Sequence, residues 1–360
     1  MLQLNSISLV HFKNYRQQFF SFPERITGIC GPNGIGKTNL LDAIHYLCFT
    51  RSYFGRSDSQ HVHSGMSGFR IEGDFTLNGR MIKAVCIVRE TGRKEFLLDD
   101  APYDRFADHI GKFPCVIIAP DDIQVITGGS EERRRFIDAL LCQADPEYLR
   151  RLINYNKVLQ QRNGFLKAMA DRRTADMQLL DVYDQQLTID GRFIYAERKA
   201  FLADCIQKVR SFYQQISGGD GPLELSYESQ LAQEPFEILL QKYREKDIYL
   251  QRTGAGIHRD ELIITLKEQP FRNIASQGQR KSLLFALKLA EFMILKENKQ
   301  FAPLLLLDDV FEKLDEQRMH NLLDQVCMQN EGQLFITDTH SQRMHDHLKR
   351  LGLPYQLLQL

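Results

Sequence analysis

Tryptophan is absent from the 360 residues, and so is any excess of charge, because 46 Lys and Arg residues balance 46 Asp and Glu residues. A zero net charge argues against a broadly basic coat that holds nucleic acid by bulk attraction, although it leaves room for a local basic groove. Hydrophobic residues make up 43% and charged residues 26% of the chain. This ordinary globular composition excludes a disordered or collagen-like chain. At about 100–200 residues per domain, the length predicts two or three domains.

Long hydrophobic runs and cysteine pairs are also missing. No run reaches the roughly 18–20 apolar residues of a membrane-spanning helix, and the best candidate, residues 301–310, contains two aspartates. The first residues show no basic segment followed by an apolar one, so we expect no secretory signal. The seven cysteines are dispersed without a C-x-x-C pair, which is typical of reduced cysteines in a core. We therefore expect a cytoplasmic protein that makes no contact with a membrane.

Hydrophobic periodicity divides the chain into three segments. Residues 1–129 predict strands around one helix, and residues 130–252 are mainly helical. Residues 253–360 return to a mixed pattern, in which a helix over 279–296 precedes a continuous apolar strand over 304–307. Such a strand is typical of the centre of a parallel sheet. We expect the first and third segments to form one domain into which the second is inserted.

Two of these segments allow a closer prediction. In the first, short alternating runs with turns at Asn78-Gly79 and Thr91-Gly92 predict an antiparallel meander, with strands at 69–75, 81–88, 94–98 and 114–118. In the second, apolar stripes predict an antiparallel helical hairpin. Its arms cover 131–170 and 176–217, about 35–40 residues each.

One motif points directly to chemistry. The pattern G-x-x-x-x-G-K-[ST] of a phosphate-binding P-loop is matched by Gly31, Pro32, Asn33, Gly34, Ile35, Gly36, Lys37 and Thr38. The glycines allow backbone N–H groups to surround a phosphate, and the following helix directs its positive dipole end at the same anion. Lys37 would neutralise the β and γ phosphates of ATP, and the Thr38 hydroxyl would bind Mg²⁺.

A pair of carboxylates supplies the second half of such a site. Asp308 and Asp309 follow the apolar strand of four leucines. Asp308 is placed to hold Mg²⁺, and Asp309 to polarise the attacking water as a general base. Because 270 positions separate Thr38 from Asp308, the two halves must come together across an inserted domain.

Further motifs carry a resemblance to a known family. Ser276-Gln277-Gly278-Gln279 resembles the signature motif of ABC-type ATPases, and residues 31–34 resemble the P-loop of SMC-like ATPases. Together with the stretches 119–122, 133–138, 155–163, 256–260 and 308–311, they make the whole chain similar to the RecF family of recombination mediator ATPases. The resemblance implies an α/β fold: an ABC/SMC-like P-loop ATPase head with an antiparallel β subdomain and an inserted α-helical hairpin domain.

The resemblance also implies residue roles. Ser276, Gly278 and Gln279 would contact the γ-phosphate held by a second copy of the chain, and Asp315 would lie at the same interface. The remaining positions implied near the nucleotide are Lys13, Asn14, Asn39 and His340. Asp338 stands where threonine is commoner in the family, so the γ-phosphate sensor stays open among Thr337, Thr339 and His340. Ile257 replaces the usual proline before His258-Arg259-Asp260, so the backbone turn there is also open.

The function implied is an ATP-dependent DNA clamp in recombinational repair. Two heads would close over duplex DNA next to a single-strand gap when ATP binds, and slow hydrolysis would release them. The implied partners are RecR and RecO and, indirectly, the recombinase RecA. Three alternatives fit less well: a transporter subunit has no coupling surface here, a structural SMC protein needs longer arms, and a nucleotide-regulated nuclease needs a further acidic domain.

Several basic residues leave their role open between a functional contact and a structural one. Arg133 to Arg135 follow two glutamates, which favours a self-paired helix start. His258 and Arg259 fit a structural pair and a functional pair equally well. The 51–56 loop mixes basic and aromatic residues, a mixture that suits DNA.

Overall fold

The computed structural model describes residues 1–360 except 56, 173–175, 218–221, 311–320, 322–323 and 329–330. The chain forms two compact units, and each is described by itself. Unit 1 comprises Met1–Asp122, Phe212–Gly219 and Gln277–Leu360, and unit 2 comprises Ile123–Ser211 and Asp220–Ser276. Unit 2 therefore includes residues 253–276, which the sequence pattern grouped with the C-terminal segment. The reason is strand pairing, because Glu261–Leu266 is hydrogen-bonded to Leu223–Glu228 within this unit.

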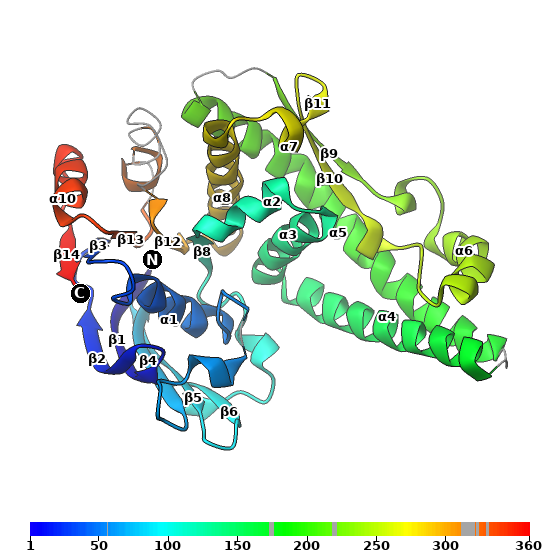
Figure 1. The fold of residues 1–360 in the computed structure, drawn as a ribbon, viewed down its shortest axis with the longest axis horizontal. Coiled ribbons are helices and arrows are strands. Elements are labelled where there is room, and N and C mark those ends of the chain that lie inside the picture. Colours follow the sequence, from blue (N-terminus) through cyan, green and yellow to red (C-terminus); the bar gives the residue numbers. More distant parts are fainter. Residues whose placement is uncertain (56, 173–175, 218–221, 311–320, 322–323, 329–330) are drawn as a thin grey trace. The chain divides into compact units, whose positions relative to one another are not determined.

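Two sheets build unit 1 (Figure 1). The antiparallel sheet has the order β2-β1-β4-β5-β6-β7, with the bounds β1 Leu2–Phe12, β2 Tyr15–Ser21, β4 Phe69–Leu77, β5 Arg80–Val88, β6 Lys94–Leu98 and β7 Ala101–Pro102. The second sheet has the order β14-β3-β13-β12-β8, with the bounds β3 Ile26–Cys30, β8 Cys115–Ile118, β12 Leu304–Leu307, β13 Leu334–Asp338 and β14 Gln356–Gln359. Every pairing in this second sheet is parallel.

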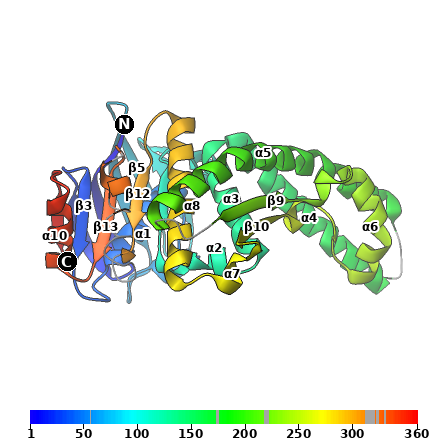
Figure 2. The same cartoon turned by 90° about the horizontal axis from the view of Figure 1, so that it is seen from above.

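Among the residues described, the longer helices that lie wholly in unit 1 are α1 (Lys37–Phe49), α8 (Gln277–Lys299) and α10 (Ser341–Arg350). Helix α1 contacts β4 and β5 of the antiparallel sheet and also β8 and β13 of the parallel sheet. Its apolar residues Leu40, Ile44 and Leu47 are fully buried in the core that the two sheets share. Helix α8 contacts β8, and α10 contacts β3 and β14. Figure 2 shows β3, β13 and β12 side by side, with α10 beyond β3. The contacts of α1 with both sheets hold this helix, which follows the P-loop, between them.

The predicted meander is confirmed for β4, β5 and β6 but wrong for its last strand. Asn78 and Gly79 both have positive φ in the β4–β5 turn, as the Asn-Gly pair predicts. By contrast, β8 pairs in parallel with β12 in the other sheet. All four residues of β8 are buried. A continuous apolar run of this kind is typical of a strand covered on both faces, so the short segment belongs in the parallel sheet.

Unit 2 consists of a small sheet and six helices among the residues described. The antiparallel sheet has the order β11-β10-β9. Its strands are β9 Leu223–Glu228, β10 Glu261–Leu266 and β11 Gln269–Pro270. The helices are α2 Gln124–Thr127, α3 Ser130–Ala144, α4 Pro146–Arg172, α5 Met177–Ser217, α6 Phe236–Leu250 and α7 Phe271–Ile274. The last residues of α5 belong to unit 1.

The first arm of the predicted hairpin is two helices instead of one. It breaks between α3 and α4, where Asp145 has an extended backbone and Pro146 is the first residue of α4. Proline is favoured at a helix start, where its missing N–H costs no hydrogen bond. The Asp145 carboxylate accepts a hydrogen bond from the Glu147 N–H at 2.8 Å. The sequence signal was present in the Asp-Pro pair, but the periodicity of the flanking residues masked it.

Candidate functional site

The P-loop follows β3 and ends at α1, as the motif predicts. Gly31, Gly34 and Gly36 all have positive φ, at 155°, 81° and 125°. At Gly36 there is also no room for a side chain, since an added Cβ would lie 2.5 Å from the Asn14 Nδ2 atom. Only glycine meets both demands. The loop geometry therefore follows from the residues that the motif specifies.

Lys37 lies inside this loop. Its ammonium Nζ donates to the carbonyl oxygens of Gly31 at 2.8 Å and Pro32 at 3.2 Å. Only 4% of the residue is exposed. In both of these hydrogen bonds the nearly buried ammonium has a neutral carbonyl as its partner. Such an ammonium suits an anionic ligand, because carbonyl oxygens compensate a positive charge less well than a phosphate does.

The two predicted halves of the site meet in unit 1. The Thr38 hydroxyl lies 3.0 and 2.9 Å from the two carboxylate oxygens of Asp308. Asp308 is buried at the end of β12. A hydroxyl and a carboxylate are the hard oxygen ligands that Mg²⁺ prefers, so the residues present fit this ion.

The environment of Asp308 raises the pKa of its carboxyl group above the ordinary 3.8. Burial is the main cause, and hydrogen bonds from Thr337 and Thr38 act in the opposite direction. A nearby cation would stabilise the ionised form further. The carboxylate is thus a buried charge that a bound cation would compensate.

Thr337 of β13 organises both acidic residues. Its hydroxyl donates to the Asp308 Oδ1 atom at 2.8 Å and accepts from the Asp309 backbone N–H at 2.9 Å. Asp309 is half-buried and has a φ of 46°, in the left-handed region that non-glycine residues rarely adopt. Sequence analysis considered Thr337 only as one of three γ-phosphate sensors. Its role beneath the acidic pair depends on the pairing of β12 with β13.

The loop after β13 is organised by Asp338. Its carboxylate accepts from the Arg343 Nε at 2.9 Å and from the His340 backbone N–H at 3.2 Å. Burial acts to raise the pKa of Asp338, but Arg343 and these backbone donors outweigh it, so the pKa is lowered. Asp338 is therefore neutralised by an arginine five residues later. Asp338 and Arg343 hold the backbone on which His340 lies.

The β1–β2 turn lies against the P-loop. Lys13 forms an ion pair with Asp42 of α1 at 2.6 Å. Asn14 and Asn39 are joined by a hydrogen bond of 2.7 Å from the Asn39 Nδ2 atom to the Asn14 Oδ1 atom. The structure thus brings the predicted residues Lys13, Asn14 and Asn39 together beside residues 31–38. Tyr15, which sequence analysis did not select, belongs to the same group through a hydrogen bond to the Gly36 carbonyl.

The signature residues lie at the start of α8. Ser276 precedes the helix and is exposed, and Gly278 and Gln279 are half-exposed in its first turn. The remaining predicted interface residue, Asp315, lies outside the described residues. An open helix N-terminus with a serine beside it can receive an anion.

The basic residues of unit 2 whose role the sequence left open are used within the unit. Arg133 forms an ion pair with Glu261 at 2.7 Å. His258 has both ring nitrogens in hydrogen bonds, one with the Tyr155 hydroxyl at 2.8 Å and one with the Thr253 carbonyl at 3.1 Å. Burial lowers the pKa of His258 to about 4. These contacts account for the residues as structural groups.

Arg135 differs, since it is exposed and, among the residues that the structure describes, pairs with two glutamates of its own helix. The described residues of the 51–56 loop, by contrast, make contacts within unit 1. Asp42 accepts hydrogen bonds from the Ser52 hydroxyl and the Tyr53 N–H, both at 2.8 Å, and the Tyr53 hydroxyl bonds to Asp122. Tyr53, one of the two aromatic residues of this loop, is therefore a link inside unit 1.

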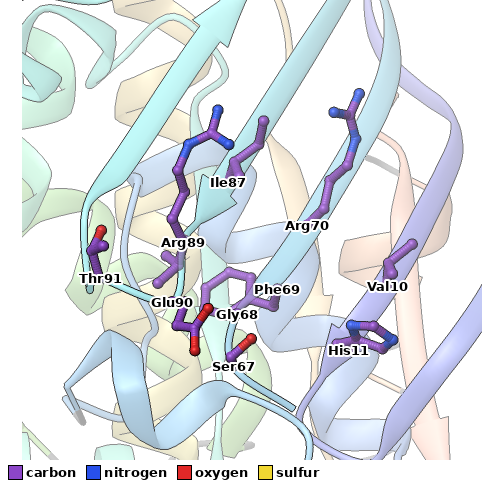
Figure 3. A pocket seen from close by; sticks show the side chains of 11 residues that line it. Val10, His11, Ser67, Gly68, Phe69, Arg70, Ile87, Arg89, Glu90 and Thr91 are labelled. Carbon is purple, nitrogen blue, oxygen red and sulfur yellow. The ribbon is translucent and has the colours of Figure 1, made fainter.

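A groove of about 490 Å³ lies on the antiparallel sheet, at the ends of β1, β4 and β5 (Figure 3). None of its lining residues belongs to the P-loop or the acidic pair. Its two arginines, Arg70 and Arg89, are ion-paired with Glu72 and Glu95. The groove is thus nearly neutral and separate from the site.

Across the described part of the chain, no helix is long and apolar enough to span a membrane.

Comparisons with known proteins agree with this geometry. A family model described as an AAA domain matches residues 6–326. The DNA replication and repair protein RecF of Flavobacterium johnsoniae is 40% identical over 359 residues, which cover 100% of both chains. A solved structure of the recombination mediator protein RecF with ATP, described within the RecFOR pathway, superposes with a TM-score of 0.87 at 30% identity. It covers 94% of this chain and 92% of that one.

A more distant likeness concerns the fold alone. The Smc head domain of Pyrococcus furiosus superposes with a TM-score of 0.57 at 17% identity, covering 96% of this chain and 92% of that one. This confirms the predicted α/β head of the SMC type. Because a full-length RecF relative is 40% identical and the P-loop is in place, the chain belongs to the RecF family of DNA replication and repair proteins.

Proposed function

We propose that this protein is an ATP-dependent DNA-binding clamp in recombinational repair and replication restart. Two copies close over duplex DNA next to a single-strand gap, help to load the recombinase, and separate after slow ATP hydrolysis. The observation that carries the proposal is the hydrogen bonding of Thr38 to Asp308. It supports a nucleotide site assembled from two distant parts of the chain.

The residues of one copy divide the work of binding and hydrolysis. Lys37 would exchange its two carbonyl partners for the β and γ phosphates, and Thr38 and Asp308 would hold Mg²⁺. Bound MgATP supplies the phosphoryl group and the metal's positive charge. Asp309 would accept the proton of the attacking water at its carboxylate. Thr337 fixes the Asp309 backbone and the Asp308 side chain at the same time.

The second copy would complete the site through the start of α8. The exposed Ser276 and the first turn beyond it, with Gly278 and Gln279, offer a hydroxyl and N–H groups to the γ-phosphate of the facing copy. Asp315 would join this interface, and His340 would face the γ-phosphate from the organised loop after β13. Such a sandwich makes dimerisation depend on ATP.

The partners follow from the family. We propose RecR and RecO as direct partners and RecA as an indirect one, because the solved RecF relative is described within the RecFOR pathway. The zero net charge fits switched binding of DNA, since a neutral surface holds DNA weakly until a groove forms between two copies. Arg135 is the arginine of the 133–135 run that is exposed enough to contribute.

A DNA titration with and without ATP, at two salt concentrations, tests the proposal. The wild type should bind gapped duplex only with ATP, and binding should weaken as salt rises. Lys37→Met should remove both ATP-dependent dimerisation on a sizing column and DNA binding. Asp309→Asn should keep ATP binding and accumulate the dimer. Equal DNA affinity with and without ATP, or a Lys37→Met dimer that forms normally, would refute the clamp.

A further inference from the structure

Two side chains of the β1–β2 turn hold the outer side of the P-loop. The Asn14 Nδ2 group donates to the Ile35 carbonyl oxygen at 2.6 Å. The Tyr15 hydroxyl donates to the carbonyl oxygen of the next residue, Gly36, at 3.0 Å. Consecutive P-loop carbonyls are therefore each bound by a side chain from outside the motif.

The direction of these carbonyls matters for phosphate binding. A peptide unit is planar, so its N–H and its C=O point in opposite directions. A P-loop binds phosphate with N–H groups that point inward, and the carbonyls of the same peptide units must then point outward. Donors placed on the outside, at Ile35 and Gly36, stabilise the same orientation of the loop that a phosphate requires.

The turn that supplies these donors is itself fixed. The Lys13 backbone N–H donates to the His61 carbonyl at 2.7 Å, and the Lys13 carbonyl lies 2.8 Å from the His63 Nδ1 atom. Asn39 orients the Asn14 amide through the bond to its Oδ1 atom, which leaves the Asn14 NH₂ group facing Ile35. Tyr15 is only 8% exposed and packs edge to face on Phe20. Both donors therefore lie on a rigid support.

The turn also lies so close to the P-loop that position 36 has no room for a side chain. An added Cβ at Gly36 would lie 2.5 Å from the Asn14 Nδ2 atom and 2.8 Å from the Tyr15 hydroxyl. Contacts under 3.0 Å do not occur for real Cβ atoms. The turn thus packs directly on the P-loop backbone at Gly36.

We infer that Tyr15 and Asn14 are positioning residues that set the P-loop in its phosphate-binding shape before the nucleotide arrives. This inference rests on the proposed function, because it concerns the same nucleotide site. Preorganisation raises affinity by removing the cost of ordering the loop. Because the two bonds act on ground state and transition state alike, their loss should raise KM for ATP and leave kcat nearly unchanged.

Binding of a fluorescent ATP analogue to the full chain tests this inference. Tyr15→Phe removes one neutral hydrogen bond, so we expect the analogue to bind about three- to tenfold more weakly. Asn14→Asp keeps the shape and the acceptor for Asn39 but turns a carboxylate oxygen toward the Ile35 carbonyl. This repulsion should weaken binding about tenfold or more.

Tyr46→Phe is the matched control, because Tyr46 is a buried tyrosine of α1 whose hydroxyl bonds to Asp58 and not to the P-loop. It should keep wild-type affinity, and melting without nucleotide should show that all three variants fold. If Tyr15→Phe and Asn14→Asp fold and bind like the wild type, or lower kcat instead of raising KM, the inference is overturned. If the wild type itself does not bind the analogue, the proposed function fails and the inference falls with it.

Discussion

Replacement of Thr337 by valine tests whether one hydroxyl holds the acidic pair in place. Thr337 is 0% exposed, and its hydroxyl donates to the buried Asp308 carboxylate and accepts from the Asp309 N–H. Valine has nearly the same shape, so Thr337→Val removes both hydrogen bonds without opening a cavity. The Asp308 carboxylate keeps its bond from Thr38, whereas the Asp309 N–H loses the acceptor that it has at this position.

The expected loss follows from these two bonds. A hydrogen bond to a charged group contributes roughly 1.5–3 kcal/mol and a neutral one roughly 0.5–1.5 kcal/mol. Thr337→Val should therefore lower the free energy of unfolding by about 2–4 kcal/mol. Since the Thr337 bond lowers the pKa of Asp308, its removal should also raise that pKa further.

The same sheet provides the control. Thr27 on β3 is also 0% exposed, but its hydroxyl has no hydrogen-bond partner among the described residues. Thr27→Val should therefore be neutral or stabilising, because it removes a buried polar group that gains nothing in return. Urea unfolding of the nucleotide-free protein measures both variants. If Thr337→Val lowers the free energy of unfolding no more than Thr27→Val does, the Thr337 hydroxyl does not organise the site. Thr337→Ser keeps a hydroxyl and should recover most of the free energy that Thr337→Val loses.

Two further predictions concern stability in each unit. Burial lowers the pKa of His45, His109 and His258 from the ordinary 6.5 to about 4. Below pH 6.5 the unfolded chain therefore binds more protons than the folded one. The contribution of these histidines to the free energy of unfolding is fully present above pH 6.5 and is lost between pH 6.5 and 4. Each histidine should cost about 1.4 kcal/mol at pH 5.5, and a urea midpoint that stays constant from pH 7.5 to 5.5 would contradict this. Arg198 is 1% exposed and pairs with Asp138 and Asp260 at 2.8 Å each. Arg198→Met should lower the free energy of unfolding by about 3–5 kcal/mol, because it leaves these carboxylates uncompensated. Arg135→Met, at an exposed position, should lower it by less than about 1 kcal/mol. Equal losses in the two variants would count against the buried network.

The sequence allowed the phosphate-binding loop to be predicted at the level of single residues, since its shape depends on local conformation. Gly31, Gly34 and Gly36 were predicted from the motif, and all three adopt a positive φ, which glycine does freely. The register of β8 could not be predicted in the same way. Its four apolar residues fit either sheet, and only the pairing with β12 decides between them.

Contacts between distant residues were the other part that local pattern could not supply. Thr337 meets Asp308 because β13 lies beside β12, and Tyr15 meets Gly36 because the β1–β2 turn lies on the P-loop. Neither contact leaves a mark on hydrophobic periodicity. The Asp-Pro pair at 145–146 did carry a helix start signal, so that boundary was within reach of sequence analysis.

By itself, then, the sequence determined which residues are chemically suited to a phosphate and a metal ion, because glycine dihedrals and the charge of Lys37 and Asp308 are properties of single residues. Tertiary structure alone decided how the remaining polar groups are used. Burial forces each polar group to find a partner, and sheet pairing determines which partner is in reach. For that reason Arg133 and His258, whose roles the sequence left open, are held in ion pairs and hydrogen bonds within unit 2, while Thr337 and Tyr15 lie beneath and beside the P-loop site.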